Sequence, residues 1–136
     1  MRELEKWYIH DRDYVFEKVW GHEVWIVNNE EYCGKFLNLK RNYRCSTHYH
    51  KLKDETFYIM GGVVLMEVGN NTYILRTGEA VRVRRGVLHR FTGISDATIL
   101  EISTQHFEDD SYRSNKSKKL NWREKRWLKK YLKNNA

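Results

Sequence analysis

Short stretches of apolar and β-branched residues alternate with turn residues along most of the chain. The sequence contains no proline, so glycine, asparagine and aspartate have to mark the turns. Such marks recur at short intervals, for example at Gly34, Asp54, Gly69 and Gly78. This pattern predicts a series of antiparallel strands and an all-β fold. The clearest predicted strands are Glu23–Val27, Lys35–Leu39, Cys45–His50, Glu55–Met60, Val63–Val68, Thr72–Leu75, Ala80–Val83, His89–Thr92 and Thr98–Ser103.

The number of predicted strands favours a closed sheet. A chain of 136 residues is the usual size of one domain with one core. Many short strands in so short a chain favour closure into a barrel or jelly roll, which protects the sheet edges from aggregation.

The last part of the chain has a helical period instead. Leu120, Trp127, Leu128, Tyr131 and Leu132 recur at helical spacing with Lys and Arg between them. This spacing predicts an amphipathic helix over Leu120–Leu132, with its apolar stripe docked on the barrel or on a partner.

The basic charge of the chain is concentrated in the same part. The net charge is +7, and residues 113–136 hold ten Lys or Arg against one acid, Glu124. Residues 1–112 then carry 15 basic and 17 acidic residues, a net charge of −2. We therefore expect two parts: a barrel with an N-terminal extension over 1–112, and a basic helical tail over 113–136.

The basic tail also admits nucleic-acid binding, because Trp122, Trp127 and Tyr131 are interleaved among its Lys and Arg residues. An amphipathic helix with a charged outer face explains the same residues, and the rest of the chain is nearly neutral. A helix that covers a sheet face or a dimer seam is the favoured interpretation.

Cysteine content and hydropathy indicate the compartment. Cys33 and Cys45 have no CxxC partner and are expected to be free thiols in a reducing environment, although a bridge between two neighbouring strands stays possible. The longest apolar stretch, Val63–Met66, is too short to cross a bilayer, and Met1–Lys6 has no apolar run typical of a signal peptide. We expect a cytoplasmic protein with no membrane partner.

The strongest chemical signal lies between residues 48 and 55. His48 and His50 are two apart on a strand, so their imidazoles share one face. After a turn at Lys51–Asp54, Glu55 begins the next strand and can reach the same point, and His89 follows the turn at Gly86. Three imidazoles and a carboxylate suit one divalent transition metal such as Mn, Fe, Co, Ni, Cu or Zn.

These residues resemble the two motifs of the cupin superfamily. His48, His50, Glu55 and Gly62 have the spacing of the first motif, and Gly78, Gly86 and His89 have the spacing of the second. Asn42 and Arg84 stand where the motifs have glycine and proline, and Gly93 stands where the second ends in Asn. The resemblance covers residues 18–105. It implies a cupin double-stranded β-helix, a jelly-roll barrel, with His48, His50, Glu55 and His89 as metal ligands and a homodimer as the assembly.

The flanks of this region are similar to those of cupin-type phosphomannose isomerases and related sugar isomerases. The similar segments are Lys18–Glu23, Leu100–Gln105 and Glu108–Arg113, the last of which shortens the family's acidic stretch. We expect the barrel to stand without the nucleotidyltransferase domain that often accompanies such a module. The resemblance implies metal-dependent aldose–ketose isomerisation of a sugar or sugar phosphate through an enediolate.

Several residues are candidates for proton transfer and for substrate binding. Glu101, Lys35 and the ligand Glu55 are candidate bases. Arg84 and Arg90, with Arg82 and Arg85, could receive a phosphate, and Tyr43, Tyr58, Trp20 and Trp25 could stack on a sugar. His22 and His106 have no spacing argument and are expected at the surface.

Two other functions fit the same ligand set. An Fe(II) or Ni(II) cupin dioxygenase would use the open metal positions for O₂ and a chelating substrate. A non-catalytic carbohydrate-binding cupin would hold the sugar without turnover.

Overall fold

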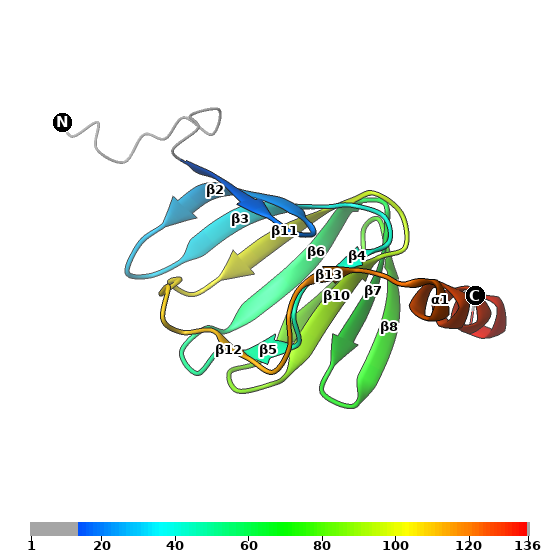
Figure 1. Ribbon diagram of the computed structural model, residues 1–136. Helices are drawn as coiled ribbons and strands as arrows, with labels where there is room; N and C mark the ends of the chain where they lie inside the picture. The colour runs from blue at the N-terminus through cyan, green and yellow to red at the C-terminus, as the bar shows by residue number, and fades with distance from the viewer. Residues whose placement is uncertain (1–13, 136) are drawn as a thin grey trace.

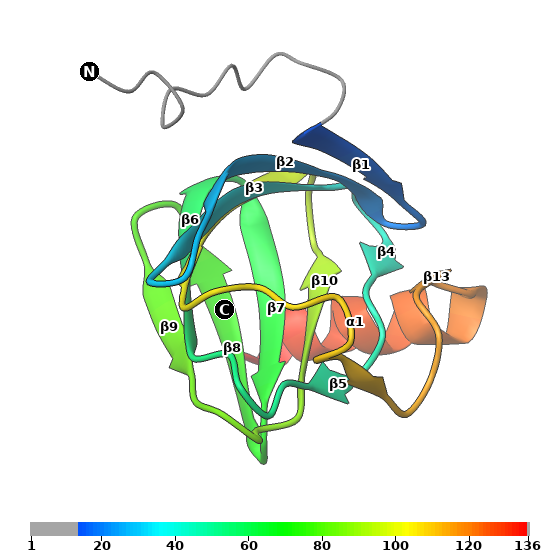
Figure 2. The same ribbon diagram turned by 90° about the vertical axis from the view of Figure 1, so that its left-hand side faces the viewer.

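The strand segments predicted from the sequence pair into two antiparallel sheets in the computed structural model, which describes residues 14–135 (Figure 1). The first sheet, sheet A, has six strands in the order β1 (Val15–Lys18), β2 (Gly21–Asn28), β3 (Cys33–Leu39), β11 (Ala97–Ser103), β6 (Glu55–Gly61) and β9 (Ala80–Val83). In sheet B, which has seven strands, the order is β12 (Tyr112–Arg113), β5 (His48–Tyr49), β10 (His89–Gly93), β4 (Tyr43–Arg44) and β13 (Lys118–Lys119); β7 (Val63–Val68) also pairs with β10, and β8 (Asn71–Arg76) pairs with β7. The two sheets curve around a common interior (Figure 2), so the predicted all-β jelly-roll barrel is confirmed.

The interior is apolar at one end and polar at the other. Every second side chain of β3, β6 and β11 points inward. Leu37, Ile99 and Ile59 are paired across these strands and form part of the buried core. One inward position further along, the paired residues are Lys35 and Glu101, both buried. The strand pairing therefore carries charged side chains into the polar end of the barrel.

Of the predicted strand Cys45–His50, only β5 (His48–Tyr49) forms, and the short strand β4 (Tyr43–Arg44) lies just before the predicted range. Between them, the backbone N–H groups bond to side chains of the C-terminal segment instead of a neighbouring strand: the Ser46 N–H donates to Ser117 Oγ and the Thr47 N–H to Asn115 Oδ1. Those partners are about 70 residues away in sequence, as the pairs Ser46–Ser117 and Thr47–Asn115 show. A local pattern of residues could not predict the interruption.

The segment after β11 continues the barrel. β12 pairs with β5, and β13 pairs with β4, so both add short strands to sheet B. The boundary expected between residues 112 and 113 falls inside β12. Residues 112–113 therefore pair with β5, which carries His48, and residues 118–119 pair with β4 just before it.

Two positions that depart from the cupin motifs lie next to each other, Asn42 in the turn before β4 and Gly93 at the end of β10. Asn42, which stands where a glycine is expected, has φ 65°, a left-handed conformation that asparagine tolerates better than most residues. At Gly93 a Cβ atom would lie 2.5 Å from the backbone oxygen of Lys40, so the close approach of two backbones requires glycine there. Both departures are compatible with the fold.

The C-terminal helix α1 (Trp122–Asn135) confirms the predicted helix, shifted by two to three residues at each end. Asn121 caps it: its side chain accepts a hydrogen bond from the Glu124 N–H, and the Glu124 carboxylate accepts one from the Asn121 N–H. Leu120 and Leu128 pack on Leu65, on the outer face of sheet B. Trp127, expected on the apolar stripe, is 53% exposed and stacks on Tyr131 instead.

No helix of the described residues has the length and apolar composition needed to span a membrane. The apolar face of α1 is used for docking on sheet B instead.

The docking of α1 gives a first prediction. Replacing the buried Leu128 with alanine should lower the free energy of unfolding by about 2–4 kcal/mol, because it removes apolar contact with Leu65 and leaves a cavity. In chemical denaturation, this loss of stability would appear as a lower denaturant concentration at the midpoint, with an unchanged dependence of the free energy on denaturant. Lys129→Ala, at an exposed neighbouring position, should change stability by less than about 0.5 kcal/mol; equal effects would contradict the docked helix.

Candidate metal centre and the cavity around it

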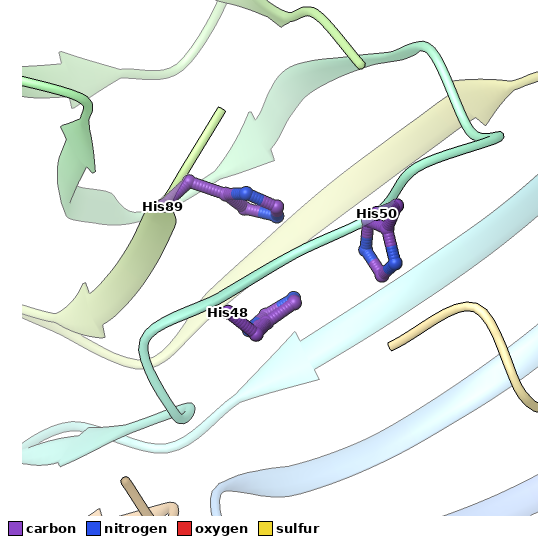
Figure 3. A group of neighbouring side chains, drawn as sticks. All are labelled: His48, His50 and His89. Atoms are coloured by element: carbon purple, nitrogen blue, oxygen red, sulfur yellow. The ribbon is translucent and has the colours of Figure 1, made fainter. Parts of the chain in front are cut away.

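Three histidines come together at the polar end of the barrel. His48 begins β5, His50 follows β5 directly, and His89 begins β10 opposite His48 in the sheet. One ring nitrogen from each lies within 4.8 Å of the others. Figure 3 shows the three rings, carried by two neighbouring segments, facing a common space.

The backbone fixes which nitrogen of each ring can bind a metal. In all three histidines Nδ1 lies at hydrogen-bond distance from a backbone carbonyl oxygen, which can only accept, so Nδ1 carries the proton. The distances are 2.7 Å from His48 to Ser46, 2.8 Å from His50 to Asp110 and 3.0 Å from His89 to Val87. In the neutral ring Nε2 then has a free lone pair.

Burial favours the neutral form of two of these rings. It lowers the pKa of His48 to about 3, with a further contribution from His89. It also lowers the pKa of His50, although Glu55 opposes the shift. Both imidazoles are therefore uncharged at neutral pH, which is the form that coordinates metal ions.

Glu55 brings a carboxylate to the same point. Its Oε2 lies 3.1 Å from His89 Nε2 and 3.4 Å from His50 Nε2. Both Glu55 Oε2 and His89 Nε2 are buried and lack a hydrogen-bond partner. With the proton of His89 on Nδ1, two lone pairs face each other, and a metal ion between them would satisfy both. Burial lowers the pKa of His89, but the contacts with Glu55 and the Val87 carbonyl together outweigh burial and raise that pKa above its usual value, so this position attracts positive charge.

The four atoms fit a divalent transition metal. Three imidazole nitrogens and one carboxylate oxygen are a usual donor set for Mn, Fe, Co, Ni or Zn. The backbone carbonyls that hold Nδ1 are the outer partners such a site requires. The residues present therefore fit the metal that the sequence predicts.

Asp110 supports the ligands from outside. Its backbone oxygen holds the His50 ring, and its carboxylate accepts hydrogen bonds from the N–H groups of Lys51, Leu52 and Lys53, at 2.9–3.2 Å. This loop joins His50 to Glu55. Asp110 thus fixes the relative position of two of the four donors, a role that no spacing in the sequence indicated.

A second polar cluster lies beside the four donors. Lys53 Nζ is 2.6 Å from Glu101 Oε2 and 4.0 Å from Glu55 Oε1. Lys53 and Lys35 both reach His106 Nδ1, at 3.1 and 3.2 Å. Glu101 also accepts a hydrogen bond from the Ser103 hydroxyl at 3.1 Å. A buried ion pair and a histidine are therefore next to the candidate metal ligands.

The charges of this cluster keep each other ionised. Burial raises the pKa of Glu101, but Lys53 and Lys35 outweigh it and hold that pKa below its usual range. Burial lowers the pKa of Lys53, but Glu101 and Glu55 hold it above its usual range. Burial, with Lys35 and Lys53, lowers the pKa of His106 to about 3, so its ring is neutral. Its Nδ1 accepts from the two ammonium groups, which leaves the proton on Nε2.

Three of the four donors and this cluster border one cavity of about 500 Å³, a size typical of small-molecule sites. His48, His50, Glu55, Lys53 and Glu101 line it. Its walls also include Lys35, His106, Trp20, Trp25, Glu23 and Arg113. Trp25 presents an aromatic face, over which Lys35 Nζ lies at 4.2 Å. Polar and aromatic groups together suit a polar ligand such as a sugar.

The cavity brings together some of the predicted site residues and leaves others out. Glu101 and Lys35 point into it, as do His48, His50 and Glu55, while His89 is buried beside Glu55. The four predicted substrate residues do not line it: Arg84 is exposed, Arg90 is paired with Glu67, Tyr58 points outward from sheet A, and Tyr43 packs on the core.

Two residues of the cavity were missed from the sequence. Lys53 was expected in a turn and given no role, yet it is only 3% exposed because Glu101 and Asp110 hold it. The expectation that His106 lies at the surface is wrong, since its side chain is 13% exposed and contacts both lysines. Cys33 and Cys45 are free and buried, as expected.

Known proteins share this architecture. The family model of the cupin domain matches residues 36–103, half of the chain. No curated protein matches the sequence significantly. Solved structures with the same fold include KdgF from Halomonas sp., with 15% identity and a TM-score of 0.61 over 65% of this chain and 81% of KdgF. An RmlC-like cupin from Shewanella frigidimarina has 14% identity and a TM-score of 0.65, with coverage of 70% and 86%.

A third similar structure is CapF from Staphylococcus aureus, described as a capsular polysaccharide assembling protein. The identity is 16% and the TM-score 0.65, over 73% of this chain but only 33% of CapF, so this chain spans about a third of that protein. At these identities the likeness shows the fold. With the family match, the barrel and the histidine cluster, the chain belongs to the cupin family.

Proposed function

We propose that this cupin is a metal-dependent isomerase that interconverts the aldose and ketose forms of a sugar or sugar phosphate, with His48, His50, Glu55 and His89 as metal ligands. The observation that carries the proposal is the Lys53–Glu101 ion pair, which borders the same cavity as His48, His50 and Glu55, three of the four donors. Isomerisation needs an electrophile and a base at adjacent carbons, and this cavity offers both.

When bound, the metal supplies a Lewis acid that polarises the substrate carbonyl. Glu101 is the favoured base among the residues considered, because the neighbouring ammonium groups keep it a carboxylate. It would take the proton from C2 and return it to C1, while the hydroxyl proton passes from O2 to O1, so that the carbonyl moves from C1 to C2 through the enediolate. Lys35 is less suited to this role, since its ammonium lies between Glu23 and the ring of Trp25.

The remaining polar groups are placed to hold the substrate. The ammonium groups of Lys53 and Lys35 can donate hydrogen bonds to its oxygens. The Nε2 proton of the neutral His106 faces the Glu108 carboxylate at 3.3 Å. The description of CapF as a polysaccharide assembling protein supports a carbohydrate ligand.

The test is exchange of the C2 proton. Metal-loaded protein incubated with aldoses and their phosphates in D₂O should incorporate deuterium and form the ketose. Glu101→Gln should lower the rate by about 10²–10⁴-fold while metal content stays stoichiometric, because the change removes the base and no ligand. Glu30→Gln, on an exposed loop, should leave the rate unchanged.

Other outcomes would replace the proposal. Metal-dependent O₂ consumption without proton exchange would indicate the Fe(II) or Ni(II) dioxygenase. Tight sugar binding without exchange would indicate a carbohydrate-binding module. Full activity of Glu101→Gln would exclude Glu101 as the base.

A further inference from the structure

Arg113 differs from the other basic side chains that border the cavity of about 500 Å³. The lysines and arginines that line this cavity are Lys18, Lys35, Lys53 and Arg113. Each of the three lysines has a carboxylate oxygen of Glu23 or Glu101 at 2.6–3.9 Å. Among residues 14–135, no carboxylate forms an ion pair with Arg113. The described part of the chain therefore leaves one cation of the cavity wall uncompensated.

Strand pairing directs Arg113 toward the candidate metal ligands. Arg113 lies directly opposite His48 in the pairing of β12 with β5, and opposed residues of an antiparallel pair project from the same face. The neighbouring pair, Tyr112 and Tyr49, projects from the other face, where the two rings stack at 5.0 Å between centroids. His48 points into the cavity, and Arg113 lines the cavity beside it.

A guanidinium in this place acts against a bound metal ion. Burial is the main cause of the lowered pKa of His48, and the charge of Arg113 is a smaller cause that acts in the same direction. A cation that disfavours a protonated imidazole also disfavours a metal ion bound to that ring, because like charges repel. An anion that lies between the guanidinium and the metal removes this repulsion. The arrangement is therefore favourable when the ligand of the cavity brings a negative charge.

Serine hydroxyls line the same cavity and have protons to donate. The residues are Ser46, Ser111 and Ser117. Ser46 Oγ lies 3.4 Å from His48 Nδ1, and Ser111 Oγ lies 3.5 Å from His50 Nδ1. Both ring nitrogens carry a proton, so each hydroxyl can only accept there. Ser117 Oγ accepts from the Ser46 N–H. Within residues 14–135 no acceptor takes the three hydroxyl protons, which are free for an anionic ligand.

We propose that Arg113, together with these hydroxyls, binds an oxyanionic group of the ligand, a phosphate or a carboxylate, so that the cavity takes an anionic sugar in preference to a neutral one. A guanidinium donates two parallel hydrogen bonds to either group. This site replaces the predicted phosphate residues Arg84 and Arg90, which do not border the cavity. Arg113 lies after residue 103, where the family match ends, so no motif spacing pointed to it.

The inference rests on the proposed function for the rest of the ligand, a sugar that reacts at Glu101. Glu101 lies on β11 of sheet A, whereas Arg113 lies on β12 of sheet B. The base and the anion site are thus carried by different sheets, with the candidate metal ligands His48 and His50 bordering the same cavity. This placement suits a sugar that has its carbonyl at one end and its charged group at the other.

The test is calorimetric titration of the metal-loaded protein with three probes: glucose 6-phosphate, glucuronate and glucose. At least one anionic probe should bind about 10-fold or more tightly than glucose. Arg113→Gln should weaken binding of that probe by about 10–100-fold and leave glucose unchanged, because the variant loses charge-assisted hydrogen bonds. The anionic probe that binds more tightly identifies the group as phosphate or carboxylate. Arg126→Gln, at an exposed position of α1, removes the same charge and should change nothing.

Arg113 is exposed, so its replacement should leave the circular dichroism spectrum intact. Arg113→Lys keeps the charge but not the planar fork, and should retain part of the preference for the anionic probe. Equal binding of glucose and both anionic probes would overturn the proposal. So would full anion binding by Arg113→Gln, which would indicate that the metal alone holds the anion, or no binding of either anionic probe at millimolar concentration.

These titrations need no turnover, so the anion site and the proposed isomerase can fail separately. Anion binding that depends on Arg113, without exchange of the C2 proton, would exclude the isomerase and keep the anion site. Proton exchange in neutral sugars as fast as in anionic ones would keep the isomerase and exclude the anion site.

Discussion

Replacing His48 with alanine is expected to abolish stoichiometric metal binding and, with it, turnover. The change removes one of three Nε2 donors, while the other rings stay held by the carbonyls of Asp110 and Val87. Loss of an outer partner alone typically costs a metal site 10–100-fold in affinity, so loss of a donor should cost more than about 100-fold. Elemental analysis and competition with a chromophoric chelator would measure the change.

Thermal melting gives a second measure of the same effect. Metal that binds only the folded state stabilises it by about 2.7 kcal/mol at 100 times its dissociation constant. A chelator should therefore lower the melting temperature of the wild type but not of His48→Ala. His22→Ala is the matched control, because His22 contacts Asn38 on the outer face of sheet A. A His48→Ala protein that keeps a full metal ion would disprove the ligand assignment.

Replacing Lys53 with methionine should destabilise the protein by about 3–5 kcal/mol, since it leaves the Glu101 carboxylate buried next to the cavity without its closest cation. Adding Glu101→Gln to this variant should restore part of the loss, because the remaining side chain is uncharged. Denaturant unfolding of the wild type, both single variants and the double variant would give the coupling energy. Lys129→Met, at an exposed position of α1, should change stability by less than about 0.5 kcal/mol.

The stability lost in the Lys53→Met variant should become smaller as the pH falls. The folded-state pKa of Glu101 lies below its ordinary value of 4.5, so its contribution is complete above that pH and is lost as the pH falls below it. The difference between wild type and Lys53→Met should thus be constant near neutrality and shrink in acid. Additive single changes, or a gap that widens in acid, would show that the pair contributes no net stability.

Alternation along strands predicted much of this site. It placed His48 and His50 on one face, and it also predicted that Lys35 points inward with Leu37. The same alternation also indicates that Tyr58 and Arg90, two of the predicted substrate residues, point away from the interior of the barrel. If Glu55 points inward, Tyr58 must point outward, and if His89 points inward, Arg90 must point outward.

The remainder of the site depends on contacts that no local pattern carries. Lys53 is held by Glu101, 48 residues further along the chain, and the loop around it is held by Asp110. His106 lies after the last predicted strand, and only the pairing of β11 with β3 brings it to Lys35. Burial of a lysine or a histidine depends on its partners, and these are brought together only by the folded barrel.

The Asp110 contacts also make the site depend on a part of the chain beyond the matched domain. All four candidate ligands lie at or before residue 89, and the family match ends at residue 103. The carbonyl that orients His50 and the carboxylate that holds the loop before Glu55 come later, at Asp110. A chain cut at the end of the matched domain would therefore keep every donor and lose the groups that orient two of them.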